Sequence, residues 1–309
     1  MTTLLIHHPA SLEHQTGSGH PERPDRIRAV DKVLAGDAFG SLDRRLAEKA
    51  TFEQVALAHP REYVDAIEEA APQNGSVRID SDTVMSPGTL EAILRGAGAG
   101  VQGVDAVLGG EAKNAFAAMR PPGHHAEKTR AMGFCLFNNA AIAARHAQVK
   151  HGIGRVAIVD WDVHHGNGSQ DIFWADATVM YCSTHQMPLY PGTGATGERG
   201  DHDTIVNAPL RPGANGEAFR DAFESRILPR LEAFGPELII LSAGFDAHWR
   251  DPLANLQLEA QDFAWATKKM MDLAERHAGG RLVSILEGGY DLQGLGESVS
   301  AHVQTLMDH

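Results

Sequence analysis

The chain has 309 residues, 43% of them hydrophobic, which is enough for one large domain with an extensive core. Its 27 basic and 40 acidic residues give a formal net charge of −13. This charge argues against nucleic-acid or anionic-membrane partners, because both require a basic face. Two cysteines, Cys135 and Cys182, cannot build a disulfide framework. We therefore expect a reduced, cytoplasmic protein, and no segment approaches the roughly 18 apolar residues of a membrane span.

Short apolar runs recur along the chain and predict buried strands. They are too short for core helices, and most are bounded by Gly, Pro or polar residues. The runs are Leu4–Ile6, Ala115–Met119, Val156–Val159, Val179–Cys182, Leu238–Leu241 and Leu282–Leu286.

The segments between these runs carry helix signals. Thr51 and Gln54 have the spacing of a capping box, and proline is tolerated in the first turn of a helix. Pro60 and Pro87 are therefore expected in the first turns of helices. Asn138 can cap a helix over 139–151 that ends at Gly152, and helical patterns continue over 217–234 and 259–277. Strands that alternate with helices predict one α/β domain over residues 1–309, with a parallel sheet covered on both faces. Separate α and β halves fit this interleaving poorly.

Titratable and metal-binding residues follow four of the predicted strands. They occupy Arg120–His125, Asp160–Gly168, Ser242–Asp246 and Glu287–Tyr290. Ligands of open parallel sheets bind beyond the carboxyl ends of the strands, whereas chance would scatter such residues over both edges. The convergence predicts an active site at this edge.

The strongest local signal predicts a metal site. Asp162 and His164 are two residues apart, so in extended backbone their side chains point the same way and can share one ion. Asp246 is the natural third ligand, and Asp160 can hydrogen-bond a neighbour. Zinc is the default ion with water in the open position, although two carboxylates and one histidine also suit ferrous iron. The less specific alternative is that Asp162 and His164 only cap a loop.

Two adjacent imidazoles, His124 and His125, follow a stiff Pro-Pro-Gly sequence. Such a pair is suited to proton transfer at neutral pH. Asp160 and Asn167 are the candidates to receive their Nδ1 protons. Alternatively, these histidines bind the metal themselves or are ordinary polar residues at the surface. Asp162, His164 and Asp246 already suffice for an ion, however, which favours proton transfer.

Aromatic residues beside glycines form a third signal. Tyr290 follows a Gly-Gly pair after a strand, and its phenol can donate to a developing oxyanion. Phe134, after Gly133, and Tyr190, before a Pro-Gly pair, can wall a narrow apolar channel. Ordinary packing in the core explains these rings equally well.

The ordered set of motifs resembles the histone deacetylase family over roughly residues 5–300. The matching segments are HPERPDR, RPPGHHA, MGFCLFNNAAIAA, VDWDVHHGNGSQDIF, YPGTGA, SAGFDAH and LEGGYDL. Asn167, where class I members carry Asp, is similar to the class II and bacterial amidohydrolase branch. The resemblance implies the arginase–deacetylase fold, an eight-stranded parallel sheet between helices, with one catalytic zinc and structural potassium.

The resemblance also implies catalytic roles. Asp162, His164 and Asp246 resemble the zinc ligands. His125 resembles the general base and acid, with His124 as its electrostatic partner. Tyr290 resembles the residue that polarises the scissile carbonyl.

Further roles are implied for residues around this centre. Phe134 and Tyr190 resemble the aromatic walls of the acyl-lysine tunnel. Asp82 resembles the residue that orients the substrate backbone, and Arg23 the arginine behind the metal. Main-chain groups around Asp160, Asp162 and His164, with Ser183, would form a potassium site.

These features predict a zinc-dependent amidohydrolase that removes acetyl or other small acyl groups from lysine side chains. An acetylpolyamine or other small-amide hydrolase is the alternative, and the net charge suits either cationic substrate. Leu253 follows Asp251-Pro252, where vertebrate polyamine-selective members carry a glutamate. The stretch Gln73–Pro87 is too short for the loop that narrows the entrance of bacterial acetylpolyamine hydrolases. Both features favour acyl-lysine peptides, while a homo-oligomeric state stays open.

Two other classes compete with this interpretation. Residues 245–252 resemble a ureohydrolase motif, but His248 stands where that family has its second aspartate. A two-manganese site needs bridging carboxylates, so this substitution argues against a ureohydrolase. A non-enzymatic acyl-lysine-binding module would not need a complete metal, imidazole and phenol set.

Overall fold

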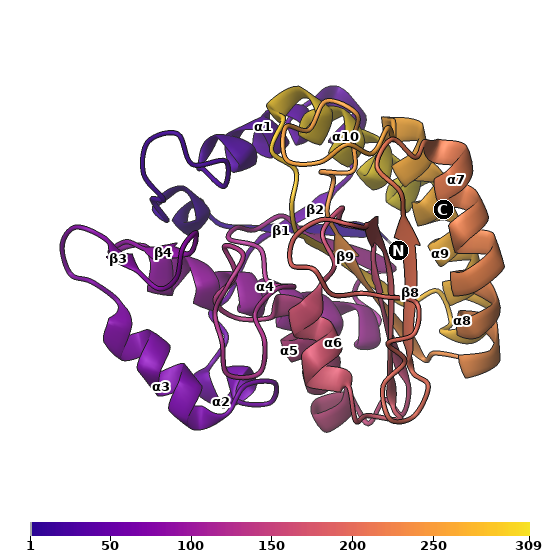
Figure 1. Ribbon diagram of the computed structural model, residues 1–309, viewed down its shortest axis with the longest axis horizontal. Coiled ribbons are helices and arrows are strands. Elements are labelled where there is room, and N and C mark those ends of the chain that lie inside the picture. Colours follow the sequence, from indigo (N-terminus) through magenta and orange to yellow (C-terminus); the bar gives the residue numbers. More distant parts are fainter. Residues whose placement is uncertain (1) are drawn as a thin grey trace.

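The computed structural model describes residues 2–309. An eight-stranded sheet lies at its centre with the order β2-β1-β5-β10-β9-β6-β7-β8, and every pair is parallel (Figure 1). The strands are β1 (Thr3–His7), β2 (Asp43–Leu46), β5 (Asn114–Ala117), β6 (Val156–Asp160), β7 (Val179–Gln186), β8 (Ile205–Leu210), β9 (Leu238–Ala243) and β10 (Leu282–Leu286). A separate antiparallel pair consists of β3 (Val77–Arg78) and β4 (Val84–Met85).

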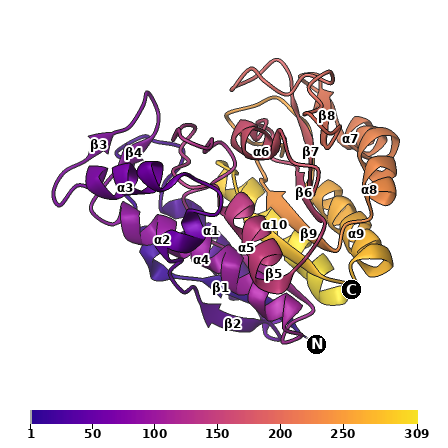
Figure 2. The ribbon, with the colours of Figure 1, turned by 90° about the horizontal axis from the view of Figure 1, so that it is seen from below.

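Helices cover both faces of the sheet (Figures 1 and 2). The hydrophobic layer on one face includes residues of α2 (Phe52–Val55), α3 (Arg61–Ala70), α4 (Thr89–Leu108), α5 (Asn139–His151) and α6 (Asn167–Phe173). The layer on the other face includes residues of α1 (Asp25–Leu34), α7 (Gly216–Ala222), α8 (Leu228–Phe234), α9 (Ala260–His277) and α10 (Leu292–Asp308).

Side chains of the central strands alternate between these two hydrophobic layers, as a period of two requires. In β6, Val156 and Ile158 enter the first layer, whereas Ala157 and Val159 enter the second. Burial on both faces explains why the central strands are continuous apolar runs in the sequence.

All six predicted strands are present, although β5 ends at Ala117 rather than Met119. The edge strands β2 and β8 were not predicted. β2 has the polar sequence DRRL, and β8 contains Pro209, which a sheet edge tolerates because one side of the strand needs no partner. Apolar periodicity is weak in both strands, and their pairing depends on the neighbouring strand.

The structure confirms the predicted helix caps but interrupts one of the predicted helices. The Thr51–Gln54 capping box, the Asn138 cap and the end at Gly152 are confirmed. The predicted helix over 217–234 is interrupted by a π-helical turn, Phe223–Ile227, and a proline follows in the first turn of α8. Because proline lacks an N–H group, the regular hydrogen-bond pattern cannot continue through it.

The placement of two prolines was wrong by one or two positions. Pro60 caps α3 and Pro87 precedes Gly88, the N-cap of α4, so neither lies in a first turn.

Both cysteines are buried and free. Among residues 2–309, no helix has the length and hydrophobicity that crossing a bilayer requires.

Buried neutral histidines make the stability of this core depend on pH. The ring nitrogens of His302, in α10, lie 2.6 and 2.8 Å from the hydroxyl oxygens of Thr267 and Ser284. Burial lowers the pKa of His302 to about 3. Burial likewise lowers the pKa of both His59 and His185 to about 4.

We predict that acid lowers the stability of the protein partly through His302. The unfolded chain binds a proton there below about pH 6.5, whereas the folded protein does so only near pH 3. The stabilisation is therefore complete above pH 6.5 and is lost as the pH falls. His302→Gln should reduce the drop in unfolding free energy between pH 7 and 5.5 by about 1 kcal/mol. Urea unfolding at both pH values measures this drop, with exposed His202→Gln as the control; equal drops in wild type and His302→Gln would contradict the prediction.

Candidate active site

A cavity of about 270 Å³ opens at the carboxyl edge of the sheet. It is lined by Asp82, His125, Gly133, Phe134, His164, Leu189, Tyr190, Leu253 and Tyr290. The structure thus brings together Phe134, Tyr190 and Asp82, which the sequence analysis assigned to the substrate channel, with Gly133 and Leu253, which we also expected to contact the substrate. Leu189 was missed, because a single leucine beside an aromatic residue carries no chemical signal.

Aromatic rings form the walls of this cavity. The centroids of the Phe134 and Tyr290 rings are 5.8 Å apart, and the interplanar angle is 78°. The ring of Tyr190 lies 5.1 Å from that of His125 at 84°. Both contacts are edge-to-face, so the walls pack directly against the polar residues at the floor.

The wall at Phe134 depends on the backbone at Gly133. Gly133 has a φ of 58°, and a Cβ atom there would lie 2.5 Å from Cδ2 of His125. Phe134 also has a positive φ, 70°, and its N–H donates to the hydroxyl of Thr83 at 3.1 Å. Only glycine combines this conformation with such close approach to an imidazole ring.

Three metal-ligand atoms converge at the floor of the cavity. Nδ1 of His164 lies 3.2 Å from Oδ1 of Asp162 and 3.0 Å from Oδ2 of Asp246. The second oxygen of each carboxylate accepts a backbone N–H, from Gly288 for Asp162 and from Val163 for Asp246, both at 2.8 Å. These backbone bonds turn one oxygen of each carboxylate toward the imidazole, as a shared ion requires.

The charges of this cluster favour a cation. Asp162 and Asp246 are buried, and burial together with Asp162 raises the pKa of Asp246 to about 7. Burial opposes the charge of His164, but the hydrogen bonds to both carboxylates outweigh it and raise the pKa of this imidazole to about 10. A Cβ at Gly288 would lie 2.3 Å from Oδ2 of Asp246, so the loop leaves room only for the carboxylates. An imidazole and two carboxylates fit a zinc ion with an open coordination position.

The adjacent histidines differ in their partners. Nδ1 of His124 lies 3.0 Å from Oδ2 of Asp160, and Nδ1 of His125 lies 2.8 Å from Oδ1 of Asn167. These are the partners expected from the sequence. The amide nitrogen of Asn167 donates to Glu127 at 2.7 Å, which turns the amide oxygen toward His125. His125 therefore carries its proton on Nδ1 and keeps a lone pair on Nε2.

The same partners separate the charges of the two rings. Burial lowers the pKa of His125, and the neighbouring His124 and His164 lower it further. Burial opposes the charge of His124 as well, but Asp162 and Asp160 raise its pKa to about 10. A neutral imidazole thus lies against a cationic one, with their centroids 4.0 Å apart.

Tyr290 is held from behind by groups that the sequence analysis did not identify. Its N–H donates to Oδ2 of Asp251 at 2.7 Å, and the guanidinium carbon of Arg26 lies 4.9 Å from its ring centroid. Arg26 also donates to the carbonyl oxygens of Gly289 and Glu287, at 2.6 and 2.5 Å.

The assignment of Arg23 to the position behind the metal was wrong. Arg23 is partly exposed and pairs with Asp25, whereas Arg26 is completely buried. Both arginines belong to HPERPDR, and α1 begins at Asp25, so the helix decides which of them turns inward.

Glu287 was noted only as part of a motif, yet it supports the histidine loop. Its carboxylate accepts the N–H of Gly123 at 2.6 Å and the hydroxyl of Ser242 at 3.1 Å. His248, the deviation from the ureohydrolase motif, is buried against α10 and does not belong to the Asp162–His164–Asp246 cluster.

Comparison with known proteins agrees with this geometry. A family model described as histone deacetylase domain matches residues 20–306. The chain is 41% identical over 284 residues to a histone deacetylase-like amidohydrolase of Pseudomonas aeruginosa, covering 90% of this chain and 74% of that protein. It is 39% identical over 327 residues to the polyamine deacetylase HDAC10 of Homo sapiens, covering 99% and 48%. The crystal structure of the HDA15 HD domain matches with a TM-score of 0.94 and 37% identity, covering 100% of this chain and 88% of that one.

The close approach of Gly133 to His125 predicts that a side chain at position 133 lowers the stability of the protein. Gly133→Ala should lower the unfolding free energy by at least about 1 kcal/mol, because it adds a clash with the imidazole to an unfavourable φ. Gly197→Ala is the matched control, since its Cβ meets nothing within 4 Å. Urea unfolding of both variants measures the difference, and equal stabilities would contradict the prediction.

Proposed function

The chain belongs to the histone deacetylase family, and on this premise we propose that it is a zinc-dependent amidohydrolase acting on acyl-lysine side chains. One observation carries the proposal. Three metal-ligand atoms, an imidazole with a free Nε2 and a phenol lie together at the floor of an apolar-walled cavity. The reaction would hydrolyse a linear amide to a carboxylate and a free amine.

Asp162, His164 and Asp246 would hold the zinc ion. When bound, zinc would supply Lewis acidity to the carbonyl and to the attacking water. Potassium would bind through main-chain groups around Asp160, Asp162 and His164 with Ser183. Asp160 and Ser183 are register partners on β6 and β7, which supports this placement.

His125 would act as the general base and then as the general acid. Its Nε2 lone pair can take a proton from the attacking water, while Nδ1 stays hydrogen-bonded to Asn167. The same Nε2–H can then protonate the leaving amine as the C–N bond breaks. His124, paired with Asp160, would add positive charge beside this centre and lower the basicity of His125.

Tyr290 would donate its hydroxyl hydrogen to the carbonyl oxygen as negative charge develops there. Burial raises the pKa of Tyr290, which keeps the phenol protonated. Phe134 and Tyr190 would flank the methylene chain of the acyl-lysine and exclude water. Asp82, which lines the cavity, would orient the substrate backbone.

The polyamine alternative is kept because of the similarity to human HDAC10. Leu253 lines the cavity, and a leucine cannot form an ion pair with a secondary ammonium. The segment from Gln73 to Pro87 contains only the short β3–β4 pair, which supports an open entrance. Both features favour peptide substrates over polyamines.

The first test is to measure the metal content of the purified protein. After treatment with a chelating resin, the protein should retain one tightly bound zinc ion per chain, and removal of this ion should abolish hydrolysis of an acetyl-lysine peptide. Two tightly bound manganese ions per chain would instead favour a ureohydrolase.

The proposed acid–base and phenol roles predict the behaviour of two variants. His125→Ala and Tyr290→Phe should each lower kcat at least about a hundredfold, the effect of losing a general base or an oxyanion donor. Both should keep the zinc ion and the circular dichroism spectrum of the wild type. Loss of zinc from His125→Ala would show that this histidine is a ligand.

Substrate choice can be measured directly. We expect a higher kcat/KM for an acetyl-lysine peptide than for acetylated putrescine, spermidine or cadaverine. Leu253→Glu should shift the ratio toward the polyamines, whereas the similarly sized, uncharged Leu253→Gln should not. A tenfold preference of the wild type for any polyamine, about 1.4 kcal/mol in transition-state binding, would establish the alternative.

A further inference from the structure

A second cluster of metal-binding side chains lies outside the active-site cavity, where α4 and α5 run side by side (Figure 2). It consists of Asp105 on α4 with His146 and His151 on α5. Nε2 of His146 and Nε2 of His151 lie 2.8 and 2.6 Å from the same atom, Oδ1 of Asp105. Both imidazoles therefore face one oxygen of the same carboxylate, although the proposed hydrolase mechanism uses none of the three residues.

We propose that Asp105, His146 and His151 form a second binding site for a divalent transition-metal ion such as zinc. Imidazole nitrogen and carboxylate oxygen are ligands that zinc prefers. The three ligand atoms lie within 4.8 Å of one another. Ligands about 2.0–2.1 Å from a tetrahedral zinc ion are about 3.3 Å apart, so each imidazole nitrogen needs to move only several tenths of an ångström away from Oδ1 of Asp105. Asp105 and His151 are partly exposed and can make this adjustment.

The surroundings accommodate such an ion at small cost. Without an ion, each ring must carry its proton on Nε2 to hydrogen-bond with Asp105. Binding would move these protons to Nδ1 or to solvent and would exchange two N–H···O contacts for three metal bonds. His151 is the last residue of α5, where the helix dipole favours positive charge. The nearly buried His146 limits competition from water on one side.

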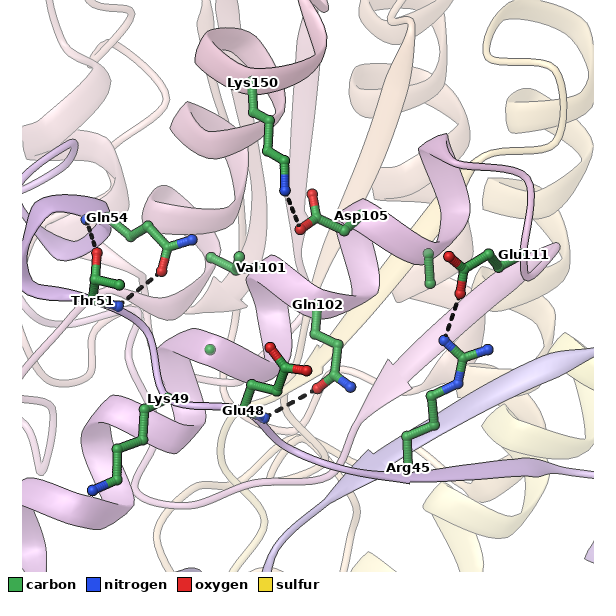
Figure 3. A pocket seen from close by; sticks show the side chains of 12 residues that line it. Arg45, Glu48, Lys49, Thr51, Gln54, Val101, Gln102, Asp105, Glu111 and Lys150 are labelled. Atoms are coloured by element: carbon green, nitrogen blue, oxygen red, sulfur yellow. Dashed lines mark hydrogen bonds and ion pairs between the residues drawn. The ribbon is translucent and has the colours of Figure 1, made fainter.

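Lys150 is the competitor for this site. Its Nζ lies 2.8 Å from Oδ2 of Asp105, as the dashed line in Figure 3 shows. The lysine side chain is 55% exposed, so it can turn into solvent when an ion binds. Asp105 and Lys150 border a polar cavity of about 380 Å³, which gives an ion access to the carboxylate (Figure 3).

An ion at this site would cross-link α4 and α5, which pack side by side on one face of the sheet. A ligand that binds only the folded state stabilises it, so excess zinc should raise Tm. This inference does not rest on the proposed hydrolase function, since the site shares no residue with the active-site cavity.

The test is a calorimetric titration with Zn²⁺ of tag-free protein after treatment with a chelating resin, with any ion that it then retains still bound. We expect the wild type to bind one further zinc ion per chain. His151→Ala and, as a second variant, Asp105→Asn should each bind this ion at least tenfold more weakly. His277→Ala is the matched control, because His277 ends α9 and pairs with Glu232 as His151 ends α5 and pairs with Asp105. Its zinc binding should equal that of the wild type.

Lys150→Met separates a metal site from a merely structural ion pair. Removal of the competing ammonium should tighten binding of the second zinc several-fold. Excess Zn²⁺ should also raise Tm in the wild type and in His277→Ala but not in His151→Ala. The proposal is overturned if the wild type binds no second ion, if His151→Ala and Asp105→Asn bind it as tightly as the wild type, or if Lys150→Met fails to tighten it.

Discussion

The burial of several carboxylates at one edge of the sheet is the constraint on which the rest of the structure depends. Asp160, Asp162, Asp246 and Glu287 are all at most 1% exposed. Buried charges of one sign are costly unless cations and hydrogen-bond donors face them. Backbone N–H groups from three different strand ends supply the donors, and the protonated imidazole of His124 and the proposed zinc supply the charge. The loops after β5, β6 and β10 must therefore be packed in register, because each offers groups that another loop needs.

A second layer of buried charge supports this edge from behind. Arg120 makes a two-pronged contact with Glu22, at 2.6 Å from Nε and 2.6 Å from the second terminal nitrogen. Arg26 donates to the same carboxylate at 3.2 Å and lies against the ring of Tyr290. One carboxylate thus joins the segment before α1 to the loops that carry the histidine pair and the phenol. Guanidinium groups suit this position because their planar donors satisfy several acceptors at once.

Hydrogen bonding to a carboxylate or to an amide gives two neighbouring imidazoles different chemistry. His124 faces Asp160 and is held cationic, whereas His125 faces the amide of Asn167 and stays neutral. The orientation of that amide depends in turn on Glu127, which the sequence analysis did not single out. The proposed base is therefore set by a chain of contacts that ends outside the cavity.

The sequence by itself determined the interior strands, the convergence of Asp162, His164 and Asp246, the histidine partners and, with the exception of Leu189, the residues that line the cavity. Apolar runs and a spacing of two residues act within a few residues of the chain, and strand ends of a parallel sheet meet at one edge. Only the tertiary structure decided that Arg26 rather than Arg23 lies behind Tyr290, that β2 and β8 complete the sheet, and that Asp105 meets His146 and His151. Each of these depends on how a helix or an edge strand is oriented against a distant neighbour, and no local pattern in the chain encodes that orientation.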